Sequence, residues 1–426
     1  MQICYPIQRT FPEPLTGSEI YLHDLARWFA TTDDVTIVTT DRSNRSAKTA
    51  EIQPPGLRVE RFPLRDGGDL RLAARYLMQR DPTQLLSRLI AAPANGALHA
   101  GSYGFRSPAL LDWLVQHPYE VVHAAAVPVG TAWAAWRGSA ASRSGFVLSP
   151  FLHLADPEVR RPYIARMLQS ADQLLAATET ERRYLLTCGV SGDVVSVIPP
   201  WVDLERFEPG DRRRFRSAWR IPPTEFVVLI PRKLEDKGAF HTLGALELLA
   251  RRGIRPTCVL LGTTRQHLQA RIDEHARRLQ GLGVRTVDLG YLPKAQLSDA
   301  LAGCDVVVEP SRVDSFGMIY QDAWLHDHPV IAARSGAVPD VVQDDRNGLL
   351  VEFGSVEGIA RAIASLVEDP ALVSRLGGRG GRDVRERYAA TRLAPLVRAV
   401  YESAASRKGS FAGALPRGPE RSGVPS

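Results

Sequence analysis

The chain has 426 residues, of which 44% are hydrophobic and 23% charged, and these values are ordinary for a soluble globular protein. Its length is about twice what one hydrophobic core organises, so we expect two domains. The net charge of +6 is spread along the chain, whereas a nucleic-acid-binding protein would concentrate its excess cations on one segment, so we expect no nucleic-acid partner.

Short β-branched runs alternate with amphipathic helical stretches almost from end to end. In the first half the expected strands are residues 2–5, 35–39, 57–62, 120–123, 145–149, 173–176 and 194–198. The second half repeats the alternation at residues 226–230, 257–261, 284–289, 305–309, 329–332 and 349–351. Strands that alternate with helices predict parallel sheets covered on both faces, so we expect an α/β protein of two Rossmann-like doubly wound domains.

Helical periodicity is clearest at residues 18–30, where Ile20, Leu22, Leu25, Trp28 and Phe29 predict one apolar stripe. The proline-rich stretch 199–209 predicts the domain break, which gives an N-terminal domain at 1–200 and a C-terminal domain at 201–388. A last helix at 389–405 is expected to pack back at the domain junction. Residues 406–426 are rich in Gly, Pro and Ser and predict a disordered tail.

Three features predict a cytoplasmic compartment. The cysteines Cys4, Cys188, Cys258 and Cys304 form no CxxC pair, and all but Cys188 lie in or beside apolar runs, as buried reduced thiols do. The first residues lack the apolar region of a signal peptide, and the uncharged stretch 123–136 is too short to span a bilayer. Residues 69–89 combine arginines with leucines, so they predict either two packed helices or a peripheral contact with the inner face of the membrane.

The residues after strands 226–230 and 305–309 are the strongest site candidates, because ligands bind beyond the carboxyl ends of parallel strands. Arg232 and Lys237 flank a turn before a helix, which predicts an anion site, although solvated loop cations explain them equally well. Asp314 and Asp322 are eight residues apart around a turn that Gly317 permits, a spacing that places both carboxylates roughly along one line if the turn leads directly into the following helix. Carboxylates suit sugar hydroxyls, while a helix cap and a solvated helix face are the structural alternatives.

Two further candidates lie in the first half. Gly17 and Ser18 begin a helix whose N-terminus is expected to point at the interdomain cleft, although Ser18 as a plain helix cap explains the pair nearly as well. His153 follows the strand 145–149 in a loop, where a histidine is more often structural than catalytic.

Together these segments resemble the retaining, nucleotide-sugar-dependent glycosyltransferases of family 4, which have the GT-B fold. The resemblance covers about residues 1–403. PSRVDSFGMIYQDAWLHDHPVIAARSGAVPD is similar to the E-x7-E motif and the segment after it, and PRKLEDKG to the phosphate-binding R-x4-K motif. VIPPWVDLERFEP is similar to the family's interdomain stretch, and ADQLLAATETERRYL to its last N-domain strand and helix.

The resemblance implies a role for each motif residue. Arg232 and Lys237 would bind the donor diphosphate, Asp314 and His153 would face the donor sugar, and Asp322 would hold the ribose. The N-terminal domain would take the acceptor and the C-terminal domain the donor. The remaining donor-binding residues would be Gly17, Tyr291, Leu292, Ser315, Phe316, Gly317 and Met318, with Tyr291 and Leu292 reading the base.

Several positions depart from the family pattern. Asp314, Asp322 and Asp340 stand where Glu is usual, so each side chain is one methylene shorter. Asp327 replaces a glycine that ends the motif helix, which predicts a left-handed acid there. Pro200 and Trp201 replace Gly and Asn, and Thr16 precedes Gly17 where a second glycine is usual.

The implied reaction is transfer of a sugar from a UDP- or GDP-linked donor to an acceptor hydroxyl, with retention at the anomeric carbon. The acceptor would be a glycan, a lipid-linked sugar or a small molecule. No D-x-D motif occurs, so we expect two protein cations in place of a metal and no cofactor. The alternatives are a non-catalytic binding subunit and another GT-B enzyme, such as an epimerase or a phosphorylase.

Overall fold

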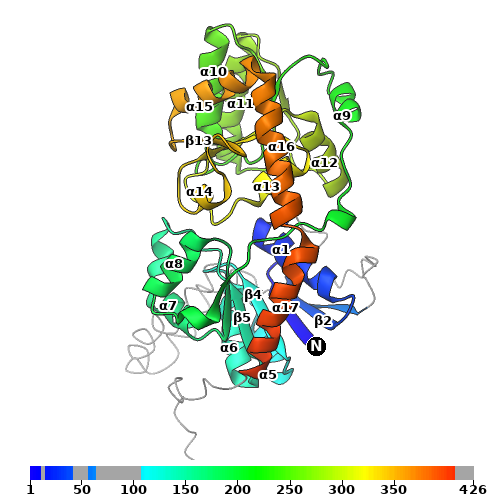
Figure 1. Ribbon diagram of the computed structural model, residues 1–426, viewed down its shortest axis with the longest axis vertical. Coiled ribbons are helices and arrows are strands. Elements are labelled where there is room, and N and C mark those ends of the chain that lie inside the picture. Colours follow the sequence, from blue (N-terminus) through cyan, green and yellow to red (C-terminus); the bar gives the residue numbers. More distant parts are fainter. Residues whose placement is uncertain (11–14, 42–55, 64–106, 408–426) are drawn as a thin grey trace, which may run out of the picture.

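The structure is a computed structural model that describes residues 1–10, 15–41, 56–63 and 107–407 (Figure 1). The segment 69–89 and the tail beyond Arg407 lie outside these residues, so the expectations about a membrane-facing surface and a disordered terminus stay predictions. The described chain forms two parallel sheets, one of seven strands and one of six.

The first sheet has the order β3-β2-β1-β4-β5-β6-β7. Its strands are β1 (Gln2–Ile7), β2 (Asp34–Asp41), β3 (Leu57–Pro63), β4 (Val121–Ala125), β5 (Gly145–Ser149), β6 (Gln173–Ala176) and β7 (Val195–Val197). The second sheet has the equivalent order β10-β9-β8-β11-β12-β13. Its strands are β8 (Val227–Ile230), β9 (Thr257–Leu260), β10 (Thr286–Asp288), β11 (Val306–Glu309), β12 (Val330–Ala333) and β13 (Gly348–Val351).

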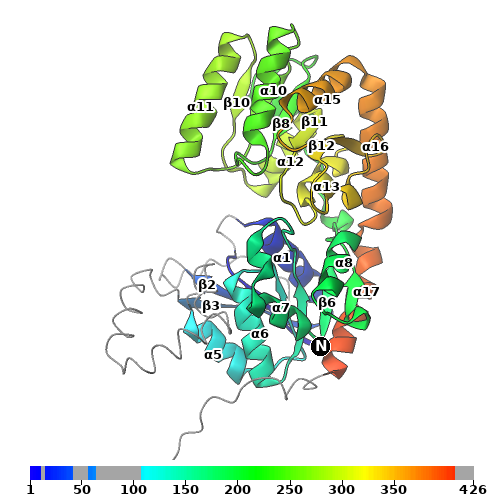
Figure 2. The same cartoon turned by 90° about the vertical axis from the view of Figure 1, so that its left-hand side faces the viewer.

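Helices cover both sheets (Figures 1 and 2). Those of the first half are α1 (Gly17–Phe29), α5 (Pro108–Gln116), α6 (Gly130–Ser142), α7 (Pro162–Gln169) and α8 (Glu179–Thr187), with short 3-10 helices η1 (Pro157–Arg160) and η2 (Gly192–Val194). The second half has η3 (Leu204–Arg206), α9 (Arg212–Ala218), α10 (Ala239–Arg251), α11 (Gln266–Gly281), α12 (Lys294–Gly303), α13 (Met318–Leu325), α14 (Val338–Val341), α15 (Val356–Glu368), α16 (Pro370–Arg387) and α17 (Ala390–Ser406).

The predicted α/β class with two doubly wound domains is therefore confirmed. Every expected strand is present with bounds shifted by a few residues at most. One local expectation needs correction. Ile20 on α1 is 40% exposed, whereas the neighbouring Tyr21 is 3% exposed and packs in the core in its place. The stretch 199–209 contains the short 3-10 helix η3.

The last helix connects the two halves of the molecule. α16 runs down beside the second sheet and continues into α17, which lies against the first domain (Figures 1 and 2). α17 packs on β4, β5 and β6, and its Tyr401 hydroxyl hydrogen-bonds Tyr5 Oη at 2.9 Å and His123 Nδ1 at 2.7 Å. This helix therefore packs back across the domain junction, as expected, and it does so through buried core contacts.

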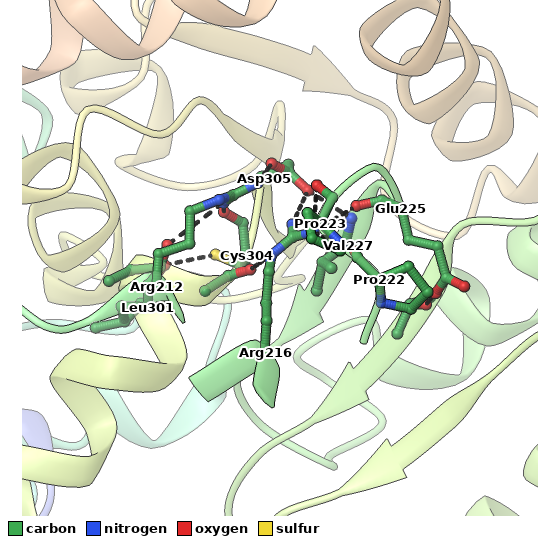
Figure 3. A network of polar contacts seen from close by, with 12 residues as sticks. Arg212, Arg216, Pro222, Pro223, Glu225, Val227, Leu301, Cys304 and Asp305 are labelled. Atoms are coloured by element: carbon green, nitrogen blue, oxygen red, sulfur yellow. Dashed lines mark hydrogen bonds and ion pairs between the residues drawn. The ribbon is translucent and has the colours of Figure 1, made fainter. Parts of the chain in front are cut away.

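A network of arginines fixes α9 to the amino ends of β8 and β11 (Figure 3). Asp305 accepts hydrogen bonds from Arg212 Nη2 at 2.7 Å, from Arg216 Nη2 at 2.8 Å and from the Val227 backbone at 2.7 Å. Arg216 also donates to the Glu225 carbonyl at 2.8 Å. The network lies at the sheet edge opposite the one where ligands bind, so its role is structural.

Candidate active site

The second sheet reverses its strand order between β8 and β11, which is where doubly wound sheets bind ligands. Arg232 follows the end of β8, and Glu309 is the last residue of β11. The Arg232 guanidinium donates from Nε and Nη2 to the two Glu309 carboxylate oxygens, at 3.0 and 2.8 Å. Its Nη2 also lies 3.9 Å from Asp314 Oδ2. The side chain remains 40% exposed, so it stays accessible to a ligand.

Lys237 completes a cation pair with Arg232. Its Nζ donates to Asp314 Oδ2 at 2.9 Å and to the Val313 carbonyl at 3.0 Å, and only 7% of the side chain is exposed. The next residue, Gly238, has φ +77°, and a Cβ there would meet the Pro310 carbonyl oxygen at 2.5 Å. A glycine is therefore required to bring Lys237 onto the loop after β11.

The pKa values of the two carboxylates beside the cation pair are shifted in opposite directions. Burial raises the pKa of Glu309, and the attraction of Arg232 and Lys237 offsets only part of that effect. Burial also opposes ionisation of Asp314, but Lys237 and Arg232 together hold the pKa of Asp314 below its usual range. Burial lowers the pKa of Arg232, but the negative charges of Glu309 and Asp314 raise it by more than burial lowers it. The guanidinium therefore stays charged.

Two helix N-termini point at this region. Gly238 precedes α10, and Gly317, with φ +85°, precedes α13; each glycine is in the left-handed conformation. A Cβ on Gly317 would overlap the Tyr320 ring at 2.2 Å, so this turn also requires glycine. The turn consists of the predicted residues Ser315, Phe316, Gly317 and Met318, of which Ser315 and Phe316 are buried. The first turns of α10 and α13, with their helix dipoles, therefore lie beside Arg232 and Lys237, an arrangement that suits an anion.

The first domain contributes the start of α1. A Cβ on Gly17 would lie 3.5 Å from the Met318 sulfur, so the two predicted residues meet across the domain junction. The helix cap is Thr16, whose backbone N–H and hydroxyl both donate to Glu19, at 2.7 and 2.8 Å. The alternative that made Ser18 the cap is therefore wrong, because Gly17 is already the first helical residue.

His153 lies in the exposed loop after β5. Partial enclosure lowers the pKa of its imidazole, and the charge of Lys237 lowers it further, whereas Asp314 acts in the opposite direction. The loop is held by Glu181 of α8, whose buried carboxylate accepts hydrogen bonds from the backbone of Leu152 at 2.6 Å and Ala177 at 2.7 Å. The structure thus brings His153 to the same region as Lys237 and Asp314.

The remaining predicted residues lie around this centre. Tyr291 is 50% exposed, and with Leu292 it follows β10, two strands away from β8. Asp322 is half-buried on α13 and, four residues after Met318, lies on the same helical face. Asp314 stands in the loop before that helix, so the two carboxylates do not share one helix line.

The departures from the family pattern have structural consequences. Asp327 has φ +55°, which confirms the expected left-handed acid. Asp340 accepts a hydrogen bond from the Thr180 backbone at 2.7 Å, a contact between the two domains. Trp201 is buried in the core that the first domain forms with α17, with its ring 5.8 Å from Trp28 and 6.0 Å from Phe29.

Sequence reasoning missed Glu309 as a site residue. It assigned the residue to a strand, where an acid at the end of a valine run was the only available signal. It also missed Glu181, which resembled any exposed acid of a first helical turn, and the contact that Asp340 makes with the other domain.

Within the described ranges, no group of three or more His, Cys, Asp or Glu side chains is arranged to hold a metal ion. The same ranges contain no helix with the length and apolar character needed to cross a membrane.

Two doubly wound domains in tandem are the arrangement of the GT-B class. The structure superposes on Anabaena HepE, crystallised with UDP and glucose, with a TM-score of 0.71, 20% identity and coverage of 95% of this chain and 100% of that one. The sucrose-phosphate synthase of Thermosynechococcus elongatus gives a TM-score of 0.68 at 19% identity, with 94% and 98% of the two chains covered.

Two family models match the sequence in tandem, a glycosyl transferase 4-like domain at residues 16–201 and a glycosyl transferases group 1 domain at 211–382. The chain belongs to the GT4-type glycosyltransferases, as its motifs predicted. It is 31% identical to D-inositol 3-phosphate glycosyltransferases of Catenulispora acidiphila and Saccharomonospora viridis, over 52% and 58% of this chain. These matches span 54% and 60% of the relatives' own lengths, so the chain matches only about half of each.

Proposed function

We propose that this protein transfers a sugar from a nucleoside diphosphate donor to an acceptor hydroxyl, with retention at the anomeric carbon. The observation that carries the proposal is the cation pair of Arg232 and Lys237 at the strand-order reversal, beside the N-termini of α10 and α13. Two fixed positive charges and two helix dipoles suit a diphosphate whose negative charge grows as it leaves the sugar.

In this reaction the bond between the anomeric carbon and the diphosphate oxygen breaks, and the acceptor oxygen bonds to the same carbon from the same face. The acceptor proton passes to an oxygen of the departing phosphate, so the chain need not supply a base. We assign stabilisation of the departing charge to Arg232 and Lys237, and contacts with the sugar to His153 and Asp314.

The relatives give this proposal its context. Anabaena HepE was crystallised with UDP and with UDP-glucose, and the curated relatives carry the name D-inositol 3-phosphate glycosyltransferase. We therefore propose a UDP- or GDP-linked donor. The acceptor is a hydroxyl of a glycan, a lipid-linked sugar or a small molecule, and it binds on the side of the first domain, where Gly17 meets Met318.

Donor turnover tests the proposal. The purified protein is incubated with a panel of nucleoside diphosphate sugars, and release of nucleoside diphosphate is measured with and without candidate acceptors. Lys237→Met should lower turnover at least about tenfold, since one charge-assisted contact contributes roughly 1.5–3 kcal/mol. Arg375→Met removes an arginine of α16 paired with Asp345 and should retain full activity.

A second reading, a non-catalytic binding subunit, follows from the ion pairs Arg232–Glu309 and Lys237–Asp314, which neutralise both cations. The same assay distinguishes the two. Binding of nucleoside diphosphates without release of sugar from any donor would support the binding subunit and contradict the transferase.

A further inference from the structure

A further ion pair, between a buried lysine and a partly exposed aspartate, lies beside the cation pair, and the proposed reaction does not use it. Lys233 directly follows Arg232, but the two side chains bond residues on opposite sides of β8. Arg232 reaches Glu309 of β11, whereas Lys233 reaches Asp288, the last residue of β10. Because β8 lies between β11 and β9 in the sheet, the dipeptide extends to both sides of its own strand.

The contacts of Lys233 fix its position completely. Its Nζ donates to Asp288 Oδ1 at 2.8 Å, to Asp288 Oδ2 at 2.9 Å and to Gln269 Oε1 at 3.0 Å, which accounts for all three ammonium protons. The Lys233 side chain is only 4% exposed. The Gln269 amide also donates to Asp288 Oδ2 at 3.1 Å, so lysine, aspartate and glutamine form a closed triangle.

Asp288 also holds the turn after β10 in place. Its Oδ1 accepts a hydrogen bond from the Gly290 backbone at 3.0 Å. The Gly290 carbonyl in turn accepts one from the Gly262 backbone at 2.7 Å, and Gly290 itself has φ +61°. Both the N–H and the carbonyl of Gly290 are therefore hydrogen-bonded, which fixes the turn immediately before Tyr291. The Tyr291 side chain is half exposed.

This turn lies at the sheet edge that carries the cation pair. β10 is two strands from β8, and adjacent strands are about 4.8 Å apart, so the turn is roughly 10 Å along the edge from Arg232. A nucleoside whose diphosphate is bound by Arg232 and Lys237 has a length that suits this separation. The exposed Tyr291 ring and the neighbouring backbone groups then meet its base.

We propose that Lys233 is a positioning residue, which holds the Gly290–Tyr291–Leu292 turn through Asp288 and so sets the preference for one nucleotide base. The inference rests on the proposed function, because it requires a nucleoside diphosphate at the cation pair. A backbone that discriminates between bases must be held in one place, since a mobile turn adapts its hydrogen bonds to several bases. A lysine with all its protons bonded provides that rigidity.

The test compares two kinds of ligand. Wild type and Lys233→Met are titrated calorimetrically with UDP, GDP, ADP and inorganic pyrophosphate. The methionine retains the apolar stem and removes the charge. The nucleotide that wild type prefers should bind the variant about tenfold more weakly, and the affinity ratio between the two best nucleotides should narrow at least about threefold. Pyrophosphate should bind both proteins equally within about twofold, because Arg232 and Lys237 are retained.

Asp288→Asn provides a second variant at a more exposed site, with 34% of the side chain accessible, in case the buried substitution prevents folding. It should show the same loss of base preference, while Arg375→Met should bind every ligand as wild type does. Unchanged nucleotide ratios in a folded variant would overturn the inference, and so would an equal loss for pyrophosphate. A wild-type protein that binds pyrophosphate but none of the nucleotides would overturn the proposed function, and this inference with it.

Discussion

Arg232 and Glu309 form a bidentate ion pair between the ends of the two adjacent strands at which the second sheet reverses its order. The Glu309 carboxylate is only 1% exposed. In the proposed donor complex, Glu309 and the diphosphate would share the charge of Arg232, so we expect the ion pair to limit how tightly a diphosphate binds.

Replacement of this acid should strengthen binding. Glu309→Gln removes one buried negative charge beside Arg232, and we expect the Kd for a nucleoside diphosphate to fall about tenfold, equivalent to about 1.4 kcal/mol. Calorimetric titration measures this change. Asp383→Asn, at a buried acid paired with Arg346 and Arg379, is the control and should leave the Kd unchanged. Weaker binding in the Gln variant would instead make Glu309 a support for Arg232.

We expect that the length of the Asp314 and Asp322 side chains suits this site, so that the longer glutamate impairs function at either position. Asp314 is buried and bonded to Lys237, so Asp314→Glu adds a methylene next to the reacting sugar, and we expect kcat to fall about tenfold or more. Asp322→Glu should chiefly raise KM for the donor, because ribose contacts are similar in the ground and transition states. Steady-state kinetics with varied donor measures both effects. Unchanged constants in both variants would show that neither carboxylate contacts the donor.

Turnover should be independent of added metal. The anion site is built from Arg232, Lys237 and two helix N-termini, which can stabilise a leaving diphosphate without a divalent ion. We expect activity within about twofold of its normal value in excess chelator. Loss of activity that Mg²⁺ or Mn²⁺ restores would contradict this prediction.

The arginine network at the amino ends of β8 and β11 predicts that two arginine-to-methionine substitutions differ strongly in their effect on stability. The Arg216 side chain is 5% exposed and shares Asp305 with Arg212, which is 41% exposed. Arg216→Met should lower the free energy of unfolding by about 3–5 kcal/mol, because it removes one of the cations paired with Asp305 and the arginine donor to the Gly303 and Glu225 carbonyls. Arg212→Met should lower it by at most about 1 kcal/mol. Urea unfolding compares them, and equal losses would contradict the role of burial.

Stability should fall in acid partly because of His123. This imidazole bonds Tyr401 and Ser149 Oγ, and burial lowers its pKa from 6.5 to about 3. Between those values the unfolded chain binds a proton that the folded chain does not, so stability decreases as pH falls from about 6.5 toward about 3. The slope from this group is at most about 1.4 kcal/mol per pH unit.

Urea unfolding at pH 7 and pH 5 measures this contribution. His123→Asn should be less stable at both values but should lose less between them than wild type does. His117→Phe, at an exposed histidine of the same domain, should retain the wild-type difference. An equal loss in wild type and His123→Asn would assign the acid sensitivity to other groups.

The sequence by itself determined the elements and their class. Apolar runs such as the one that ends at Glu309 alternate with helical periodicity, and this local pattern is set by neighbouring residues along the chain. It also located Arg232 and Lys237, because a cation immediately after a buried strand lies at the ligand-binding edge of any parallel sheet. The left-handed Asp327 was predictable from the family resemblance, because it stands where the family has a glycine at a helix end.

The tertiary structure alone decided which of these residues meet. Arg232 and Glu309 are 77 residues apart, and Lys233 and Asp288 are 55 apart, so no local period relates them. Their contacts depend on strand order, because β11 is third after β8 in the chain but lies beside it in the sheet, while β10 lies two strands away on the other side. Gly17 and Met318 meet only because α17 packs back on the first domain and holds the two sheets together. Pairing across strands and domains is a global property of packing, which residue spacing along the chain does not encode.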